Sequence, residues 1–420
     1  MPSDSDISLI SGESVSPVAV PDVGRARWLR VSAADRWLLR TFLRAMGDPA
    51  IRFVLWNGES VCTTGAEPVA AVHLKDRRTL LRLMYRSEIE FGEAYSDGRL
   101  RVDGDLVGLM ETVFRAPVRP WAERLLRRSR RPRNNTLSGS RHNIHHHYDL
   151  GNDFYRLWLD ERMVYTCAYF PTPSASLEDA QVAKMELVCR KVGLRPGERV
   201  VEAGCGWGAL ALHMARHHGV SVRAFNISRE QIAYAREQAR KDGLNGRVEF
   251  VEDDYRNISG QYDAFVSVGM LEHVGLEHYR DIGRVIDCCL PPHGRGFIHT
   301  IGRNRPLRVN AWIEKRIFPG AYPPTLREMM GILEPYGFSV LDVENLRLHY
   351  AMTLRHWLAR FERAAGRVAA MFDERFVRTW RLYLAGSVAA FSTGSLQLFQ
   401  VSFARPQHNA IAWTRAHLHQ

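Results

Sequence analysis

The sequence contains no run of about 18 uncharged apolar residues, the length that a helix needs to cross a bilayer, so we predict no transmembrane helix. Residues 1–25 lack the basic segment and apolar core of a secretory signal peptide, and their serine, proline and acidic residues are typical of a disordered tail. A chain of 420 residues, 45% of them hydrophobic, is long enough for two globular domains.

Cysteine is scarce, and its spacing argues against both a disulfide framework and a zinc site. The chain has six cysteines and no C-x-x-C pair: Cys62, Cys167, Cys189, Cys205, Cys288 and Cys289. Three consecutive histidines, His145 to His147, cannot easily coordinate one ion together, and no carboxylate at helical spacing completes the set. We therefore expect a cytoplasmic protein with reduced thiols and no metal site.

Acidic residues are outnumbered, which gives a formal net charge of +11 and calls for an acidic partner, either nucleic acid or an anionic membrane. Six arginines gather between residues 124 and 135: Arg124, Arg127, Arg128, Arg130, Arg131 and Arg133. This segment is either a solvated linker or a membrane anchor, to which each basic residue contributes on the order of 1 kcal/mol.

The pattern along the chain predicts a small domain over residues 26–116, a basic linker over 117–141 and a larger domain over 142–420. In the first domain we expect helices at 34–46 and from 80, strands at 51–55 and 69–74, and an amphipathic helix after turns at Asp97-Gly98 and Asp103-Gly104. From residue 177, strands alternate with helices. This alternation predicts a doubly wound α/β fold with a mostly parallel sheet and a ligand at the carboxyl ends of its strands.

A glycine-rich turn between residues 200 and 213 joins a strand to a helix. Gly204, Gly206 and Gly208 permit a tight turn that a nucleotide-like cofactor can approach closely. Glu202 precedes the first glycine by two residues, and Ala209 stands where the dinucleotide motif has its third glycine. The combination favours S-adenosylmethionine (SAM) over NAD.

The next two strands end in polar residues with two readings each. Ser228 and Gln231 either cap the following helix or bind the ribose of a cofactor, since no acid stands there. Asp254, followed by Tyr255 and Arg256, is either a cap or a contact to adenine.

Two further strands end in residues suited to acid–base chemistry. Glu272 and His273 directly follow one of them, and His299 ends another. A buried carboxylate is costly unless a partner compensates it, which a catalytic role would explain. Upstream, aromatic residues either form core or line an acyl channel that faces a carbocation: Phe154, Tyr155, Trp158, Tyr165, Tyr169 and Phe170.

Taken in order, these segments resemble the cyclopropane-fatty-acyl-phospholipid synthases, a SAM-dependent family related to the mycolic acid cyclopropane synthases. The matching segments are HYDLGNDFY (147–155), YTCAYF (165–170), VEAGCGWG (201–208), DYR (254–256), SVGMLEHVG (267–275), HTIG (299–302), IFP (317–319), the run from Tyr350 to Trp357, and LQLFQVSF (396–403). The resemblance implies a Rossmann-like SAM-dependent methyltransferase fold with a smaller N-terminal α+β lipid-binding domain.

The resemblance also implies two sets of site residues. Bicarbonate would be held by Cys167, Glu272, His299, Ile301 and Tyr350. SAM would be bound by Tyr165, Thr166, Gly204, Gly206, Ser228, Gln231 and Asp254. One departure is Ser387, which stands where many members of the family carry a cysteine.

The implied reaction is methylene transfer from SAM to the cis double bond of an unsaturated phospholipid acyl chain. Methyl transfer produces a carbocation, and bicarbonate assists its deprotonation to a cyclopropane. Alternatives are a C-methyltransferase that makes methyl-branched acyl chains, a small-amine N-methyltransferase, and a basic nucleic-acid-binding module. We expect peripheral association with the inner face of the cell membrane, a homodimer as one possible assembly, and no nucleic-acid partner.

Overall fold

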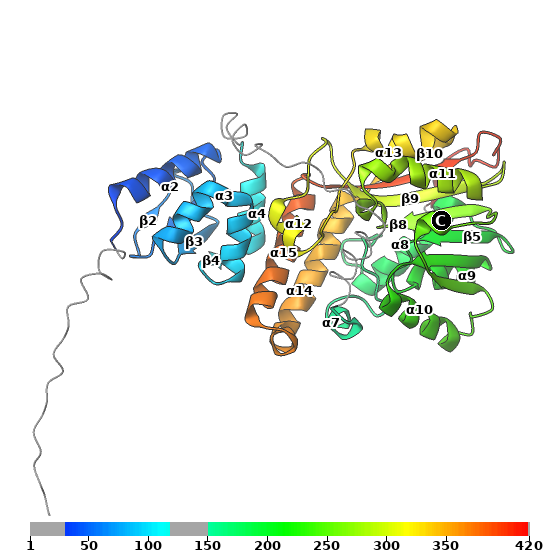
Figure 1. The fold of residues 1–420 in the computed structure, drawn as a ribbon, viewed down its shortest axis with the longest axis horizontal. Coiled ribbons are helices and arrows are strands. Elements are labelled where there is room, and N and C mark those ends of the chain that lie inside the picture. The colour runs from blue at the N-terminus through cyan, green and yellow to red at the C-terminus, as the bar shows by residue number, and fades with distance from the viewer. Residues whose placement is uncertain (1–29, 118–149, 419–420) are drawn as a thin grey trace, which may run out of the picture.

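The computed structural model describes residues 30–117 and 150–418. The tail 1–25, the arginines of the linker and His145 to His147 lie outside these ranges, so their predictions stay untested. In Figure 1, a small sheet near the N-terminus and a larger sheet stand on opposite sides of a pair of long helices, α14 (Arg347–Met371) and α15 (Glu374–Ser392).

The N-terminal unit is a four-stranded sheet in the order β2-β1-β3-β4, in which only β1 and β3 are parallel. Its strands are β1 (Ile51–Val54), β2 (Ser60–Val61), β3 (Ala70–Leu74) and β4 (Leu100–Gly104), and its helices are α2 (Ala33–Ala45), α3 (Arg77–Ser96) and α4 (Leu106–Arg115). The turn predicted at Asp103-Gly104 is instead the end of β4, because both residues pair with β3. Asp105 then caps α4.

The larger unit is a seven-stranded sheet in the order β10-β11-β9-β8-β5-β6-β7. Its strands are β5 (Arg199–Ala203), β6 (Ser221–Asn226), β7 (Val248–Glu252), β8 (Ala264–Val268), β9 (Arg295–Gly302), β10 (Ser339–Asn345) and β11 (Gln397–Ala404). The five strands from β9 to β7 are parallel, and β11 runs antiparallel to both of its neighbours. This confirms the predicted mostly parallel α/β sheet.

Helices cover both faces of this sheet. One face carries α8 (Leu177–Val192), α9 (Ala209–His218) and α10 (Arg229–Lys241), and the other carries α11 (Tyr279–Cys289) and α13 (Leu326–Leu333). The chain leaves β5 toward β6 and later returns to β8 on the other side of β5. The strand order therefore reverses between β5 and β8, which is where doubly wound sheets bind their ligands.

The pair α14–α15 joins the two sheets. The sequence predicts a helix from residue 355, but α14 begins at Arg347, two turns earlier. Its apolar side chains, with those of α15, belong to one hydrophobic cluster that runs from Leu39 and Val72 to Trp357 and Trp380. The two units thus share a continuous core.

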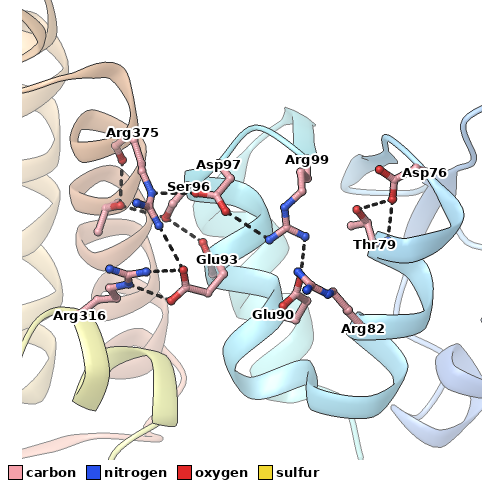
Figure 2. Close-up of polar contacts among 12 residues, drawn as sticks. Asp76, Thr79, Arg82, Glu90, Glu93, Ser96, Asp97, Arg99, Arg316 and Arg375 are labelled. Atoms are coloured by element: carbon pink, nitrogen blue, oxygen red, sulfur yellow. Dashed lines mark hydrogen bonds and ion pairs between the residues drawn. The ribbon is translucent and has the colours of Figure 1, made fainter.

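A buried carboxylate, Glu93 of α3, strengthens the interface between the units (Figure 2). Its Oε1 accepts hydrogen bonds from Lys315 Nζ (3.0 Å) and Arg316 Nε (2.8 Å), and its Oε2 accepts from a second Arg316 nitrogen (2.6 Å) and from Arg375 (3.4 Å). Burial alone would raise the pKa of Glu93, but the bonds from Arg316 and Lys315 outweigh it and lower the pKa to about 2.

We expect Glu93→Gln to lower the free energy of unfolding by roughly 1–2 kcal/mol at neutral pH, because it leaves three cations without their shared carboxylate, in partial contact with solvent. A carboxylate whose pKa falls on folding contributes stability above pH 4.5 and loses it as the pH drops toward 2. The difference between variant and wild type in urea unfolding should therefore shrink in that range.

The matched control is Glu237→Gln, which removes an exposed ion pair on α10 and should change stability by less than about 0.5 kcal/mol. Equal effects of the two substitutions would contradict the importance of Glu93.

Candidate active site

The glycine-rich turn follows β5 at the reversal of strand order, and its glycines serve two purposes. Gly204, Gly206 and Gly208 all have positive φ, at 85°, 54° and 86°. A Cβ on Gly204 would lie 2.7 Å from Cβ of Met270, and one on Gly208 would lie 2.6 Å from the ring of Phe250. A Cβ on Gly206 would meet no protein atom within 4 Å. Two glycines therefore allow close packing, whereas Gly206 leaves an open face for a ligand.

Polar residues after β6 extend this surface. Asn226 donates through Nδ2 to the Gly206 carbonyl (3.2 Å) and to Oε1 of Gln231 (2.7 Å). Oγ of Ser228 accepts from the Gln231 backbone (3.4 Å), so Ser228 caps α10, the first of its two predicted roles. Gly206, Ser228 and Gln231 thus lie in one hydrogen-bonded network. Asn226, which is not among the predicted site residues, occupies the place where many related sheets carry an acid.

Asp254 lies at the neighbouring strand end, after β7. Its Oδ1 accepts from the backbone of Arg256 (3.0 Å) and caps a short 3-10 helix, Tyr255–Asn257, while Asp253 bonds to the Asn226 carbonyl (3.1 Å). The structure therefore shows Asp254 in the first of its two predicted roles, as a helix cap, and its contact to adenine stays a prediction.

Tyr165 and Thr166 come from an irregular segment that α8 holds in place. Lys184 donates through Nζ to Oγ1 of Thr166 (3.0 Å), and Gln181 donates to the Thr166 carbonyl (2.9 Å). A Cβ on Gly269, just after β8, would lie 2.8 Å from Cγ2 of Thr166. Thr166 therefore packs against the carboxyl end of β8, beside the reversal of strand order.

Two buried charged residues also lie in this region: Glu202 belongs to the pattern of the glycine turn, whereas no sequence motif assigns Lys184 to the site. Burial lowers the pKa of Lys184 to about 8 and raises that of Glu202 to about 7, although Lys184 opposes the latter shift. Oε2 of Glu202 is buried without a hydrogen-bond partner in the described part of the chain. Lys184 lies four residues from both Ala180 and Val188 on α8, so the helical spacing of these apolar residues could have predicted that Lys184 is buried.

Glu272 lies just beyond β8, in a 3-10 turn (Leu271–His273), and contacts the next strand. Its Oε1 accepts from the backbone N–H of Ile301 in β9 (2.6 Å). Its Oε2 is buried with no partner among the described residues, and burial raises the pKa of the carboxyl to about 7. A buried unpaired oxygen is rare enough to require an explanation, and a bound ligand would supply one.

His299 belongs to the same strand and lies two residues before Ile301, hence on the same face. Gln400, opposite it in β11, donates through Nε2 to His299 Nδ1 (3.1 Å). Burial lowers the pKa of His299 well below its usual value, so the ring is neutral. The bond from Gln400 then leaves the ring hydrogen on Nε2, which makes that nitrogen a donor.

Cys167, in the irregular segment before α8, and Tyr350, on α14, are connected to β9 through Leu346. Sγ of Cys167 lies 4.0 Å from the carbonyl of Leu346, one turn before Tyr350 at the start of α14. The N–H of Leu346 in turn donates to Leu398, which pairs with Ile301. Burial raises the pKa of Cys167, so it remains a thiol.

The structure therefore places Glu272 and Ile301 in direct contact. His299 lies beside them on β9, and Cys167 and Tyr350 belong to the hydrophobic cluster against which Ile301 packs.

The predicted aromatic residues divide into two groups. Phe154, Tyr155 and Trp158 are fully buried and join Tyr165 in a network that reaches Trp207 on the glycine turn, 4.9 Å from Tyr155 between ring centroids. Tyr169 and Phe170 stack instead on histidines of α14, His349 and His356. Both groups belong to or pack against the same hydrophobic cluster, which confirms the first of the two readings, and a channel-lining role stays a prediction.

A mostly parallel sheet with a glycine turn at its reversal point and a polar network beside the open glycine defines a SAM-dependent methyltransferase. The model of the mycolic acid cyclopropane synthetase family matches residues 136–401. The chain belongs to this family, as the sequence motifs predicted. A second model, a domain of unknown function (DUF7884), matches residues 38–118, which is nearly all of the N-terminal unit.

Curated relatives match the chain over most of its length. A probable fatty acid methyltransferase of Pseudomonas putida is 34% identical, covering 88% of this chain and 96% of the relative. The cyclopropane-fatty-acyl-phospholipid synthase of Escherichia coli K12 is 35% identical, covering 86% and 94%. The crystal structure of mycolic acid cyclopropane synthase CmaA1 complexed with SAH and CTAB has 29% identity and a TM-score of 0.60, covering 63% of this chain and 98% of that one. Among the described residues, no helix is both long and apolar enough to span a membrane.

Proposed function

We propose that the protein converts the cis double bond of an unsaturated phospholipid acyl chain into a cyclopropane, with SAM as the donor of the added carbon. The observation that carries the proposal is a pair of buried groups on neighbouring strands, one just beyond the end of β8 and the other within β9. Glu272 has an unpaired Oε2, and His299 carries its hydrogen on Nε2. Both groups are uncharged when the carboxyl holds its proton, so both can donate to an anion in a dry site.

The residues that follow the carboxyl ends of β5 and β6 fit SAM. Gly206 presents an open face, and the network of Asn226, Ser228 and Gln231 continues that face toward β6. Bound there, SAM supplies an electrophilic methyl group. Lys184 and Gln181 hold Thr166 against the carboxyl end of the neighbouring β8, which limits the motion of the segment that would cover the cofactor.

The residues around Glu272 fit a small anion such as bicarbonate. His299 Nε2–H and the protonated Glu272 are donors, and Tyr350 adds a hydroxyl from α14. Bicarbonate would supply a base of suitable strength in a site from which water is excluded. Cys167 and Ile301 would complete the pocket from its two sides.

The chemistry needs a dry environment because an alkene that accepts a methyl group becomes a carbocation. Loss of one proton from the new methyl group lets its carbon close the three-membered ring. Before closure, aromatic faces can stabilise the cation by about 0.5–2 kcal/mol each. Tyr155, Trp158 and Trp357 lie in the buried cluster between the glycine turn and α14, where such faces would be needed.

A second candidate reaction makes methyl-branched acyl chains from the same cation by losing a proton from a different carbon. It is favoured by the likeness to the Pseudomonas putida relative, whose name describes a probable fatty acid methyltransferase. The two reactions share all the residues above, so only the product separates them.

The acidic partner in this proposal is the lipid bilayer at the inner face of the cell membrane. Nucleic acid has no role in it, and a homodimer is one assembly that fits it. The net charge of +11 supports an anionic surface. In the N-terminal unit, Trp37 of α2 and Tyr85 of α3 are 64% and 86% exposed, so both rings are available to enter a bilayer interface, where tryptophan and tyrosine are favoured. Binding to anionic liposomes but not to RNA or DNA at moderate salt would support this part.

The deciding experiment expresses the chain in a bacterial host without cyclopropane lipids and analyses its fatty acids by gas chromatography and mass spectrometry. Cyclopropane products are expected from the wild type and from the control His293→Ala, which alters an exposed histidine. His299→Ala should lose them. Methyl-branched or methylene products would establish the second reaction instead. If the host that expresses the wild-type chain has the same fatty acids as the host without it, both reactions are refuted.

A further inference from the structure

Four metal-binding side chains from two neighbouring helices meet on the α8–α9 face of the sheet. Glu186 and Cys189 lie one turn apart in the second half of α8, His213 lies in the middle of α9, and His218 is the last residue of α9. The candidate ligand atoms of Cys189, His213 and His218 are all within 4.8 Å of one another. Oε2 of Glu186 is 3.3 Å from Nε2 of His213 and 3.1 Å from Nε2 of His218.

These separations suit a tetrahedral metal ion. Bonds of about 2.0–2.3 Å place the ligand atoms of a tetrahedron roughly 3.3–3.8 Å apart. The contacts of Glu186 with the two imidazoles are already close to this spacing. The ligand atoms of Cys189 and the two histidines are up to 4.8 Å apart, so the thiol has to turn toward the other ligands when the ion binds. Cys189 and His213 are buried, whereas the side chains of His218 and Glu186 are 18% and 29% exposed, which leaves an entrance from solvent.

The donor set selects the kind of metal. One thiolate, two imidazoles and one carboxylate are ligands that zinc prefers, while magnesium and calcium require oxygen ligands throughout. Thiolate and carboxylate together balance the charge of a divalent ion, and binding would release the thiol proton to solvent. We propose that Glu186, Cys189, His213 and His218 form a structural zinc site that fastens α8 to α9.

The site is structural because protein side chains would fill all four positions around the ion and leave none for a substrate. The same two helices contact the proposed cofactor site, since α9 begins at the glycine turn and α8 supplies Gln181 and Lys184 to Thr166. Zinc would thus fix the distance between α8 and α9, the two helices beside the proposed SAM site. The proposal departs from our sequence-based expectation of no metal, because the four residues match no common zinc spacing.

The test uses the full-length purified protein, prepared with a reductant that does not bind metal. Equilibrium dialysis against zinc chloride, followed by elemental analysis, should give one zinc per chain. Cobalt in place of zinc should give the thiolate-to-cobalt charge-transfer band and the strong visible bands of a tetrahedral site. Zinc should also raise Tm by several degrees, because it binds the folded chain preferentially.

Two pairs of variants make the test specific. Cys189→Ser should lose the charge-transfer band, whereas Cys288→Ser, which alters an exposed thiol, should keep it. His218→Gln should weaken zinc binding at least tenfold, whereas His217→Gln, its exposed neighbour, should not. Because His218 is only half-buried, its variant should fold even if Cys189→Ser does not. Substoichiometric zinc in the wild type, or equal binding by His218→Gln and His217→Gln, would overturn the proposal.

Discussion

Replacing Glu272 with glutamine is expected to lower product formation at least a hundredfold while making the protein more stable above neutral pH. Glutamine keeps the oxygen that accepts from the Ile301 N–H, and its amide can still donate a hydrogen bond from the position of the unpaired Oε2, but it can neither release nor take up a proton there. Losing a positioned proton donor or acceptor commonly costs a factor of about 10² to 10⁴. A variant that is more stable and less active separates catalysis from folding.

The gain in stability follows from the pKa. Burial raises the pKa of Glu272 from 4.5 to about 7, so the folded protein holds this proton more tightly than the unfolded chain. Stability then falls as the pH rises from 4.5 through 7, because a buried carboxylate must ionise. Above this range, Glu272→Gln should remove a penalty of up to roughly 3 kcal/mol.

Urea unfolding on both sides of this pH range, combined with lipid analysis, measures both effects. Glu249→Gln alters an exposed carboxylate on β7 and should change neither quantity. Retained cyclopropane synthesis by Glu272→Gln would remove this residue from the site, and an unchanged stability difference across the range would show that its carboxyl is not desolvated.

Local signals in the sequence predicted most of the elements because those signals act within a few residues. The alternation of apolar strands and helices from residue 177 predicted the mostly parallel sheet, and the glycine turn fixed the junction of β5 and α9. The prediction of a turn at Asp103-Gly104 was wrong, because pairing with β3 extends β4 through both residues. Local turn chemistry was overridden there by a partner far away in the sequence.

The parts of the site that sequence could not predict all depend on long-range register. Gln400 sets the tautomer of His299 only because β11 runs antiparallel to β9 and brings the two residues opposite each other. Lys184 reaches Thr166 through the packing of α8 against an irregular segment that has no periodicity of its own. Glu272 and His299 could be identified from the sequence, but the hydrogen bonds that hold them could not.

Replacing Gly206 with alanine is expected to abolish most SAM binding while lowering stability no more than the same change at a comparable glycine elsewhere. Gly206 has a φ of 54°, and a Cβ there meets no protein atom within 4 Å. The left-handed backbone makes alanine cost about 1–2 kcal/mol. If the open face of the turn is where SAM lies, the added methyl group occupies space that the cofactor needs, and affinity should fall at least tenfold.

Gly243→Ala is the matched control, because Gly243 also has positive φ (65°) and open space around its Cβ position, but follows the far end of α10. The two variants should lose similar stability in thermal unfolding, and isothermal titration calorimetry should show weakened SAM binding only for Gly206→Ala. Gly204→Ala cannot make this distinction, because its Cβ would collide with Met270 and disturb the turn itself. Equal SAM affinities for Gly206→Ala and Gly243→Ala would place the cofactor away from the open glycine, so the assignment of Gly206 would have to be abandoned even if the protein remained an active methyltransferase.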